Sequence, residues 1–202
     1  MQDSRGKTGS CVAFDIGNVC IAISPERCEE ALGIPSDLPE WADLCHEFEC
    51  GHLAEGDFLE MAMRLVPKGH LLDGGIRAAF EAKILQPIPG MEVLLKDLNA
   101  LGVRPVFFSD ISTIHLDCFR RRFPSARDYD GVYSFDVGSW KPSEAMFAAF
   151  EERHGVPLLY VDDRLELIEA ARRHGWRRSE QFSSADGTRR ILKEAISACG
   201  LM

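Results

Sequence analysis

Three short apolar segments of this chain run directly into acidic or hydroxyl side chains. The three junctions are Phe14-Asp15, Phe108-Ser109-Asp110 and Val161-Asp162-Asp163. Apolar runs of this length that stop at polar residues are typical of buried strands that lead into loops. Because buried parallel strands are apolar along their whole length, these segments favour a parallel sheet covered on both faces.

The segments between these strands carry helical patterns. The predicted helices cover residues 91–101, 111–123, 143–154 and 165–174, and a further strand is predicted at 132–135. Strands that alternate with helices indicate an α/β fold, with a Rossmann-like parallel sheet and helices on both faces. Gly175 suits the end of the last of these helices, because glycine readily adopts the left-handed conformation that ends many helices.

Residues 24–85 differ from the rest of the chain, because they contain helical patterns and little that indicates a strand. Helices are predicted from Ser24-Pro25 and over 38–50, 57–66 and 72–84. A helical block inserted after the first strand would lie above the carboxyl ends of the strands, where such sheets bind ligands. We therefore predict a Rossmann-like core of residues 11–23 and 86–202, an all-helical cap of residues 24–85, and a disordered tail of residues 1–10.

Composition limits the partners and the compartment. The 202 residues are 46% hydrophobic and carry a formal net charge of −9, so a nucleic-acid backbone would be repelled. The seven cysteines are odd in number and form no CxxC pair, which favours a reducing cytoplasm over a disulfide scaffold. Neither a signal peptide nor a membrane span is expected, and a monomer or a weak dimer is compatible with the sequence.

Polar residues at the ends of several strands of one parallel sheet would gather at one edge. These residues are Asp15 with Gly17 and Asn18, Ser109 with Asp110, Lys141, and Asp162 with Asp163. Any one of them alone is more often a turn or helix-cap residue. Together they place three or four carboxylates beside a single ammonium, and such a cluster calls for a cation, most naturally Mg²⁺ with its preference for oxygen ligands.

The motifs FDIGNV (14–19), VFFSD (106–110), WKPS (140–143) and YVDD (160–163) resemble, in this order, those of the haloacid dehalogenase superfamily of phosphotransferases and phosphatases. More narrowly, the chain is similar to the subgroup of small sugar-phosphate phosphatases that includes α-D-glucose-1-phosphate phosphatase. The resemblance implies a Mg²⁺-dependent phosphomonoester hydrolase that acts on a small phosphorylated metabolite.

The resemblance also implies a role for each matching residue. Asp15 would be the nucleophile that forms an aspartyl-phosphate. Mg²⁺ would be held by Asp15, the Gly17 carbonyl and the Asp162-Asp163 pair, with Asp163 as the direct ligand and Asp162 acting through water or by orienting it. Ser109 and the following helix N-terminus would bind phosphate oxygens, and Lys141 would neutralise the charge on the transferred group.

Two positions depart from the family pattern. Relatives usually carry a second aspartate, the general acid, where this chain has Gly17, so we expect a leaving group that needs little protonation or a proton from solvent. Asp110 stands where relatives more often have Asn. A carboxylate beside a bound phosphate is unfavourable, so we favour a helix-capping role for Asp110 over substrate binding.

Several alternatives stay open at this point. Glu47, Phe48, Gly51 and Phe58 are candidates for reaching from the cap toward Asp15, although packing within the cap would also explain them. A metal-free 2-haloacid dehalogenase of the same superfamily would also use Asp15. The third alternative is a degenerate binding module that keeps the fold and has lost turnover, for which Gly17 is the main argument.

Overall fold

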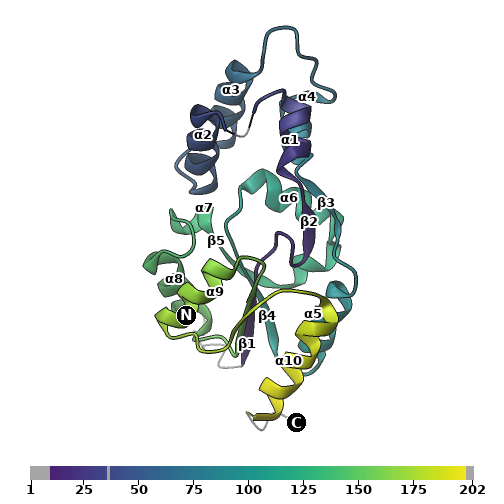
Figure 1. The fold of residues 1–202 in the computed structure, drawn as a ribbon, viewed down its shortest axis with the longest axis vertical. Coiled ribbons are helices and arrows are strands. Elements are labelled where there is room, and N and C mark those ends of the chain that lie inside the picture. Colours follow the sequence, from purple (N-terminus) through teal and green to yellow (C-terminus); the bar gives the residue numbers. More distant parts are fainter. Residues whose placement is uncertain (1–9, 36, 199–202) are drawn as a thin grey trace, which may run out of the picture.

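The computed structural model describes residues 10–35 and 37–198, and within them a parallel sheet forms the centre of the molecule (Figure 1). Its strands are β1 (Cys11–Phe14), β4 (Arg104–Ser109), β5 (Asp130–Tyr133), β6 (Leu159–Asp162) and β7 (Ser179–Gln181). They lie in the order β5-β4-β1-β6-β7 and pair in parallel throughout. The predicted α/β fold with a Rossmann-like parallel sheet is thereby confirmed.

Side chains alternate between the two faces of the sheet, and each face has its own apolar core. Val12 and Phe14 of β1 belong to one core, together with α5 (Met91–Ala100), α6 (Thr113–Arg122) and α10 (Ala185–Ala198). Cys11 and Ala13 belong to the other, with α8 (Glu144–His154) and α9 (Leu165–His174). This alternation is the period of two that a strand imposes on its side chains, and it buries β1 completely.

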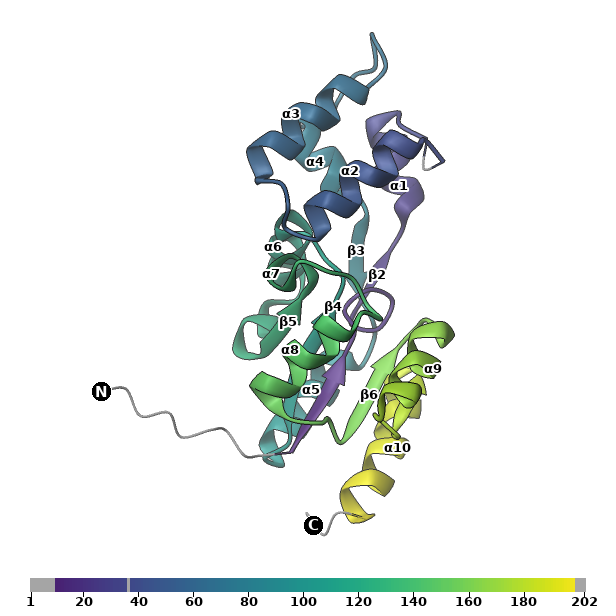
Figure 2. The ribbon, with the colours of Figure 1, turned by 90° about the vertical axis from the view of Figure 1, so that its left-hand side faces the viewer.

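A second, smaller element joins the sheet to a block of helices. The strands β2 (Ile21–Ile23) and β3 (Ile84–Pro87) form an antiparallel pair, and between them come α1 (Pro25–Leu32), α2 (Pro39–Glu49), α3 (Glu55–Leu65) and α4 (Gly75–Glu81). We call residues 24–83 the cap. Figure 2 shows the cap beyond one end of the sheet, connected to it through β2 and β3.

Aromatic side chains fill the inside of the cap and extend to the core. Phe48 of α2 stacks on Phe58 of α3 with 4.1 Å between ring centroids, and Phe80 of α4 packs at 4.7 Å from Phe58. Phe80 also stacks on His115 of α6 at 4.1 Å. The cap therefore has its own apolar centre, which continues into the helix that follows β4.

Two sets of hydrogen bonds fix where the cap meets the core. At its start and end, the Ser24 N–H donates to the Lys83 carbonyl at 2.8 Å. At the end of α2, the Ser134 hydroxyl donates to the Glu49 carbonyl at 2.6 Å and accepts from the Ile111 N–H at 2.9 Å. One of these junctions lies beside the β2–β3 pair and the other beside the end of β5.

Several predicted boundaries were wrong. The strand predicted at 132–135 ends at Tyr133, because Ser134 uses its hydroxyl to hold the cap and begins the short helix α7 (Ser134–Val137). The helix predicted at 72–84 is α4, which ends at Glu81, and Ile84 begins β3. Helix α8 begins at Glu144 because Ser143 caps it and accepts from the Met146 N–H.

The ends of the chain test the remaining predictions only in part. Residues 1–9 of the predicted disordered tail lie outside the described residues, whereas the carbonyl of Ser10 accepts from the Arg104 N–H at 3.0 Å. A 3₁₀ helix (Pro124–Asp128) precedes β5.

Among residues 10–35 and 37–198, none of the helices combines the length and the apolar character needed to cross a membrane. The division of the chain into core and cap domains stays a prediction.

Candidate active site at the carboxyl edge of the sheet

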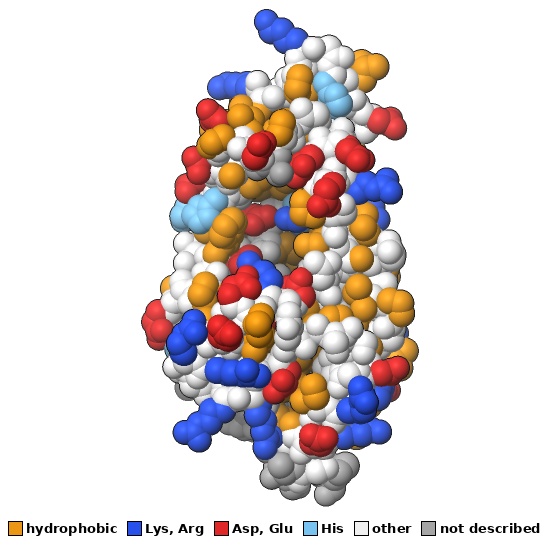
Figure 3. Space-filling model, viewed as in Figure 1, with side chains coloured by type: hydrophobic (Ala, Val, Ile, Leu, Met, Phe, Trp, Pro, Cys, Tyr) orange, Lys and Arg blue, Asp and Glu red, His pale blue; other side chains and the backbone are white. Residues whose placement is uncertain are grey.

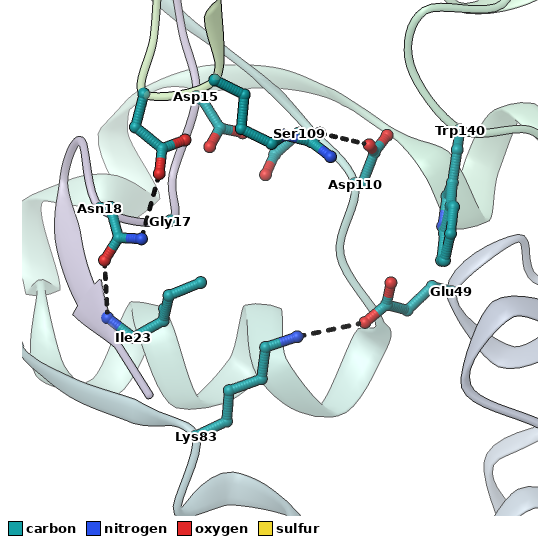
Figure 4. A pocket seen from close by; sticks show the side chains of 11 residues that line it. Asp15, Gly17, Asn18, Ile23, Glu49, Lys83, Ser109, Asp110 and Trp140 are labelled. Carbon is teal, nitrogen blue, oxygen red and sulfur yellow. Dashed lines mark hydrogen bonds and ion pairs between the residues drawn. The ribbon is translucent and has the colours of Figure 1, made fainter. Parts of the chain in front are cut away.

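The polar residues that follow β1, β4 and β6 come together at one edge of the sheet, as predicted. They line a pocket of about 260 Å³ between the sheet and the cap, visible as the hollow in Figure 3. Its lining consists of Asp15, Gly17, Asn18, Ile23, Glu49, Lys83, Ser109, Asp110, Trp140, Asp163 and Arg164 (Figure 4). The three strands are neighbours in a parallel sheet, so their carboxyl ends meet on the same side.

Lys141 lies buried beneath this pocket and joins the strands. Its Nζ is 2.9 Å from Asp15 Oδ1, 2.7 Å from Asp162 Oδ2 and 3.0 Å from the Phe108 carbonyl oxygen. Burial alone would lower the pKa of Lys141, but Asp15 and Asp162 together raise it well above its ordinary value. The side chain is therefore an ammonium, and it holds two carboxylates in fixed positions.

Asp162 is fully buried, and both of its oxygens accept hydrogen bonds. Oδ2 accepts from Lys141 and from the Tyr160 hydroxyl, and Oδ1 accepts from the Arg164 N–H at 2.9 Å. Although burial opposes its ionisation, Lys141 and these hydrogen bonds lower the pKa of Asp162. The carboxylate is therefore ionised and is held by three hydrogen bonds from the protein.

Asp15 is buried and shares Lys141 with Asp162. Burial raises the pKa of Asp15, Lys141 acts against this, and Asp162 adds to it. A hydrogen bond from Ser109 also lowers the pKa of Asp15. Asp15 Oδ1 contacts Lys141, whereas Oδ2 lies on the side of Gly17, where a β-carbon added to Gly17 would be 3.8 Å away.

Asp163 is the third carboxylate of this cluster. Oxygens of Asp15, Asp162 and Asp163 all lie within 4.8 Å of one another. Asp163 Oδ2 accepts from Asn18 Nδ2 at 3.1 Å, and Asn18 has a left-handed backbone with φ 52°. The turn after β1 therefore brings the Asn18 amide to the residues that follow β6.

The predicted helix-capping role of Asp110 was wrong. Ser112 caps α6 instead, by accepting from the His115 N–H at 3.2 Å. Asp110 Oδ1 accepts from the Lys141 N–H at 2.8 Å, and Oδ2 pairs with Arg164 at 3.0 Å. Asp110 lines the pocket with a carboxylate that an adjacent guanidinium neutralises, which removes the expected conflict between Asp110 and a bound anion.

The residues predicted to reach down from the cap do not line the pocket. Glu47 is exposed, Phe48 and Phe58 pack against each other inside the cap, and Gly51 lies against the Phe135 backbone. The cap instead contributes Glu49, at the last position of α2, and Lys83. Their side chains face each other across 3.6 Å on the side of the pocket opposite Asp15 (Figure 4).

Both of these residues were missed by sequence reasoning. Glu49 lies two positions from Glu47, and only the orientation of α2 on the core decides which of the two acids enters the pocket. The one local signal was that Glu49 lies among the buried positions at the end of an amphipathic helix, where an acid is unusual.

Solved structures supply the comparisons, since no protein-family model matches the sequence and a search of curated proteins returned no match. A HAD family enzyme from Bacteroides thetaiotaomicron aligns with a TM-score of 0.74 and 18% identity, over 89% of this chain and 95% of that chain. A predicted HAD-like family hydrolase from Porphyromonas gingivalis aligns with a TM-score of 0.73 and 22% identity, over 91% and 97% of the two chains. This chain has the haloacid dehalogenase (HAD) fold.

Two further structures with the HAD fold carry ligands. The B. thetaiotaomicron enzyme in complex with magnesium and inorganic phosphate aligns with a TM-score of 0.73 and 20% identity, over 87% of this chain and 94% of that chain. L-2-haloacid dehalogenase from Xanthobacter autotrophicus, with chloropropionic acid covalently bound, aligns less well, with a TM-score of 0.56 and 16% identity over 83% and 75%. The narrower resemblance to sugar-phosphate phosphatases stays a prediction.

Proposed function

We propose that this protein is a Mg²⁺-dependent phosphomonoester hydrolase that acts through an aspartyl-phosphate on Asp15. The observation that carries the proposal is the cluster of Asp15, Asp162 and Asp163, in which the first two share the buried ammonium of Lys141. Asp110 and Arg164 neutralise each other, so the cluster keeps two uncompensated negative charges. A divalent cation would balance them.

The oxygen donors of the pocket fit Mg²⁺. Asp15 and Asp163 supply carboxylate oxygens within reach of one ion, and Gly17 lines the same side of the pocket with its backbone. Three hydrogen bonds already hold Asp162, so we assign it to positioning Lys141, with Asp15, Asp163 and the Gly17 carbonyl as ligands. When bound, Mg²⁺ would offset the repulsion between the Asp15 carboxylate and an anionic phosphate.

The chain's own residues then carry the reaction. Asp15 attacks phosphorus, the ester bond to the alcohol breaks, and water later cleaves the aspartyl-phosphate. Lys141 is fixed by four polar contacts from the core, and it places a positive charge beside the transferred phosphoryl group. Ser109, beside Asp15 at the end of β4, donates to a phosphate oxygen.

The size of the pocket supports a small substrate. A volume of about 260 Å³ beneath the cap suits a phosphorylated metabolite such as a sugar phosphate. Free thiols at all six cysteines that the structure describes support a reducing compartment such as the cytoplasm. Among solved relatives of the HAD fold, the complex with magnesium and phosphate also supports this assignment.

The decisive experiment is a phosphatase assay with p-nitrophenyl phosphate and a panel of sugar phosphates, with and without Mg²⁺. We expect activity that EDTA removes and that Asp15→Asn lowers by about a thousandfold or more. Acid-quenched enzyme should carry a phosphoryl group on the peptide that contains Asp15, detectable by mass spectrometry.

Two other outcomes would replace the proposal. Chloride release from 2-chloropropionate without added metal would identify a haloacid dehalogenase, whose Asp15 would form an ester with carbon instead of phosphorus. Failure to turn over any substrate with Mg²⁺ present, combined with measurable phosphate binding, would indicate a binding module.

A further inference from the structure

The acidic side chains of the pocket fall into two groups. Among the described residues, Asp15, Asp110 and Asp163 line it from the core, and a hydrogen bond or an ion pair to another core residue holds each of them. Glu49 lines it from the cap, and Figure 4 shows its side chain across the pocket from Asp15. Each core acid is thus held by a polar partner from the core, while Glu49, whose partner is Lys83 at 3.6 Å, faces the space where the organic part of a phosphate ester would lie.

Glu49 also lies at the boundary between two cavities. A second cavity of about 220 Å³ opens inside the cap, with Trp41 and Phe80 among its walls. Glu49, Lys83 and Trp140 line both this cavity and the pocket that contains Asp15. An ester with its phosphate at Asp15 and its alcohol part in the cap cavity would pass Glu49, Lys83 and Trp140 at this boundary.

The position of Glu49 is fixed and largely closed to solvent. Its backbone carbonyl accepts from the Ser134 hydroxyl at 2.6 Å, and its side chain is 11% exposed. Burial raises the pKa of Glu49, and Asp110 contributes to the increase, although Lys83 opposes it. Burial lowers the pKa of Lys83, but Glu49 together with the smaller effects of Cys45 and Cys28 raises it above its ordinary value, so Lys83 keeps its own proton.

We propose that Glu49 is the catalytic residue that gives a proton to the leaving alcohol and then accepts one from the attacking water; this role rests on the proposed phosphatase function. As Asp15 bonds to phosphorus, the bond to the alcohol oxygen breaks, and that oxygen takes the Glu49 proton. The Glu49 carboxylate then removes a proton from water, whose oxygen attacks phosphorus. Inorganic phosphate leaves, and both Asp15 and the Glu49 acid are restored.

The test compares two leaving groups in Glu49→Gln. Glycerol 1-phosphate releases an alkoxide that must be protonated, whereas p-nitrophenyl phosphate releases a phenolate that leaves without a proton. We expect kcat/KM for glycerol 1-phosphate to fall about 100-fold or more and kcat/KM for p-nitrophenyl phosphate to change less than about threefold. Phosphorylated Asp15 should accumulate with the second substrate, because its hydrolysis lacks a base. Glu40→Gln, at an exposed position of the same helix, is the matched control and should change neither value.

Equal losses of kcat/KM for the two substrates would overturn the proposal in favour of a structural role for Glu49, and unchanged values for both would overturn it outright. Because Glu49→Gln leaves the Lys83 ammonium buried without its partner, Glu49→Asp provides a second measurement. It keeps an acid and should hydrolyse glycerol 1-phosphate at least about tenfold faster than Glu49→Gln; a rate no better than that of Glu49→Gln contradicts the acid role. Wild-type protein that hydrolyses neither of these substrates nor any of the sugar phosphates with Mg²⁺ would refute the phosphatase function itself, and with it the catalytic role of Glu49.

Discussion

His115 is a buried neutral imidazole at the junction of the cap and the core. Its Nε2 lies 3.0 Å from the Phe80 carbonyl and donates to it, and the ring stacks on the Phe80 side chain. Burial, with a contribution from Lys83, lowers the pKa of His115 from 6.5 to about 3. Between pH 6.5 and about pH 3, His115 is therefore neutral in the folded protein and protonated in the unfolded chain.

This difference predicts a loss of stability in mild acid. The contribution of His115 is intact above pH 6.5 and is lost as the pH falls from 6.5 toward 3. In His115→Gln, which keeps an N–H donor, the decrease in the free energy of unfolding from pH 7 to pH 5 should be smaller by about 2 kcal/mol than in wild type. Urea titrations of both proteins at the two pH values measure this difference, and identical pH dependences would show that His115 is protonated in the folded state.

Residues at the end of a buried strand, or directly after it, could be placed from the sequence. Asp15, Ser109 and Asp162 needed only the rule that the carboxyl ends of parallel strands share an edge. Glu49 could not be placed, because its direction depends on how a whole helix lies on the core. Asp110 was assigned to the wrong partner, since the ion pair with Arg164 joins residues 54 positions apart.

At the scale of elements, the end of α2 is the point where the cap touches α7. Gly51 has φ +71°, and an added β-carbon would be 2.1 Å from the Phe135 carbonyl oxygen. Gly69 has φ +85° with no atom within 4 Å of such a carbon. An alanine at Gly69 would meet only the cost of the left-handed backbone, whereas an alanine at Gly51 would also clash with Phe135. A comparison of the two substitutions therefore separates backbone strain from steric contact at the junction.

We expect Gly69→Ala to lower the free energy of unfolding by about 1 kcal/mol, the cost of a left-handed alanine. Gly51→Ala should lower it by about 3 kcal/mol or more, because α2 and α7 must also move apart. Urea denaturation of both variants measures these changes. Equal losses of the free energy of unfolding would mean that α2 and α7 move apart at no measurable cost.

The elements that could be predicted are those whose pattern is local. Helix α9 was predicted with its correct bounds because its apolar positions recur at helical spacing and Gly175 ends it. The strands β2, β3 and β7 were missed because they are not continuous buried apolar runs: most of their positions are partly or fully exposed, and β7 is polar, whereas all four residues of β1 and of β6 are buried.

At the scale of the whole molecule, metal binding should stabilise the folded state. A ligand at a hundred times its dissociation constant adds about 2.7 kcal/mol to the free energy of unfolding. We expect Mg²⁺ with inorganic phosphate to raise the melting temperature of wild type and to have little effect on Asp163→Asn. Asp43→Asn, at an exposed position on α2, should respond as wild type does. A full response in Asp163→Asn would remove Asp163 from the ligand set.

The hydrogen bond between Ser24 and Lys83 has a consequence for how such a protein can diversify. The cap leaves and rejoins the core at nearly the same point, as a tight turn does, because the Ser24 nitrogen and the Lys83 carbonyl oxygen at its two ends are 2.8 Å apart. The entropy cost of closing a loop grows only slowly with its length, so the core tolerates caps of very different size. A change in the length of the cap between these two residues should therefore cost the core little in loop-closure entropy, provided that the contact of Phe80 with His115 is kept.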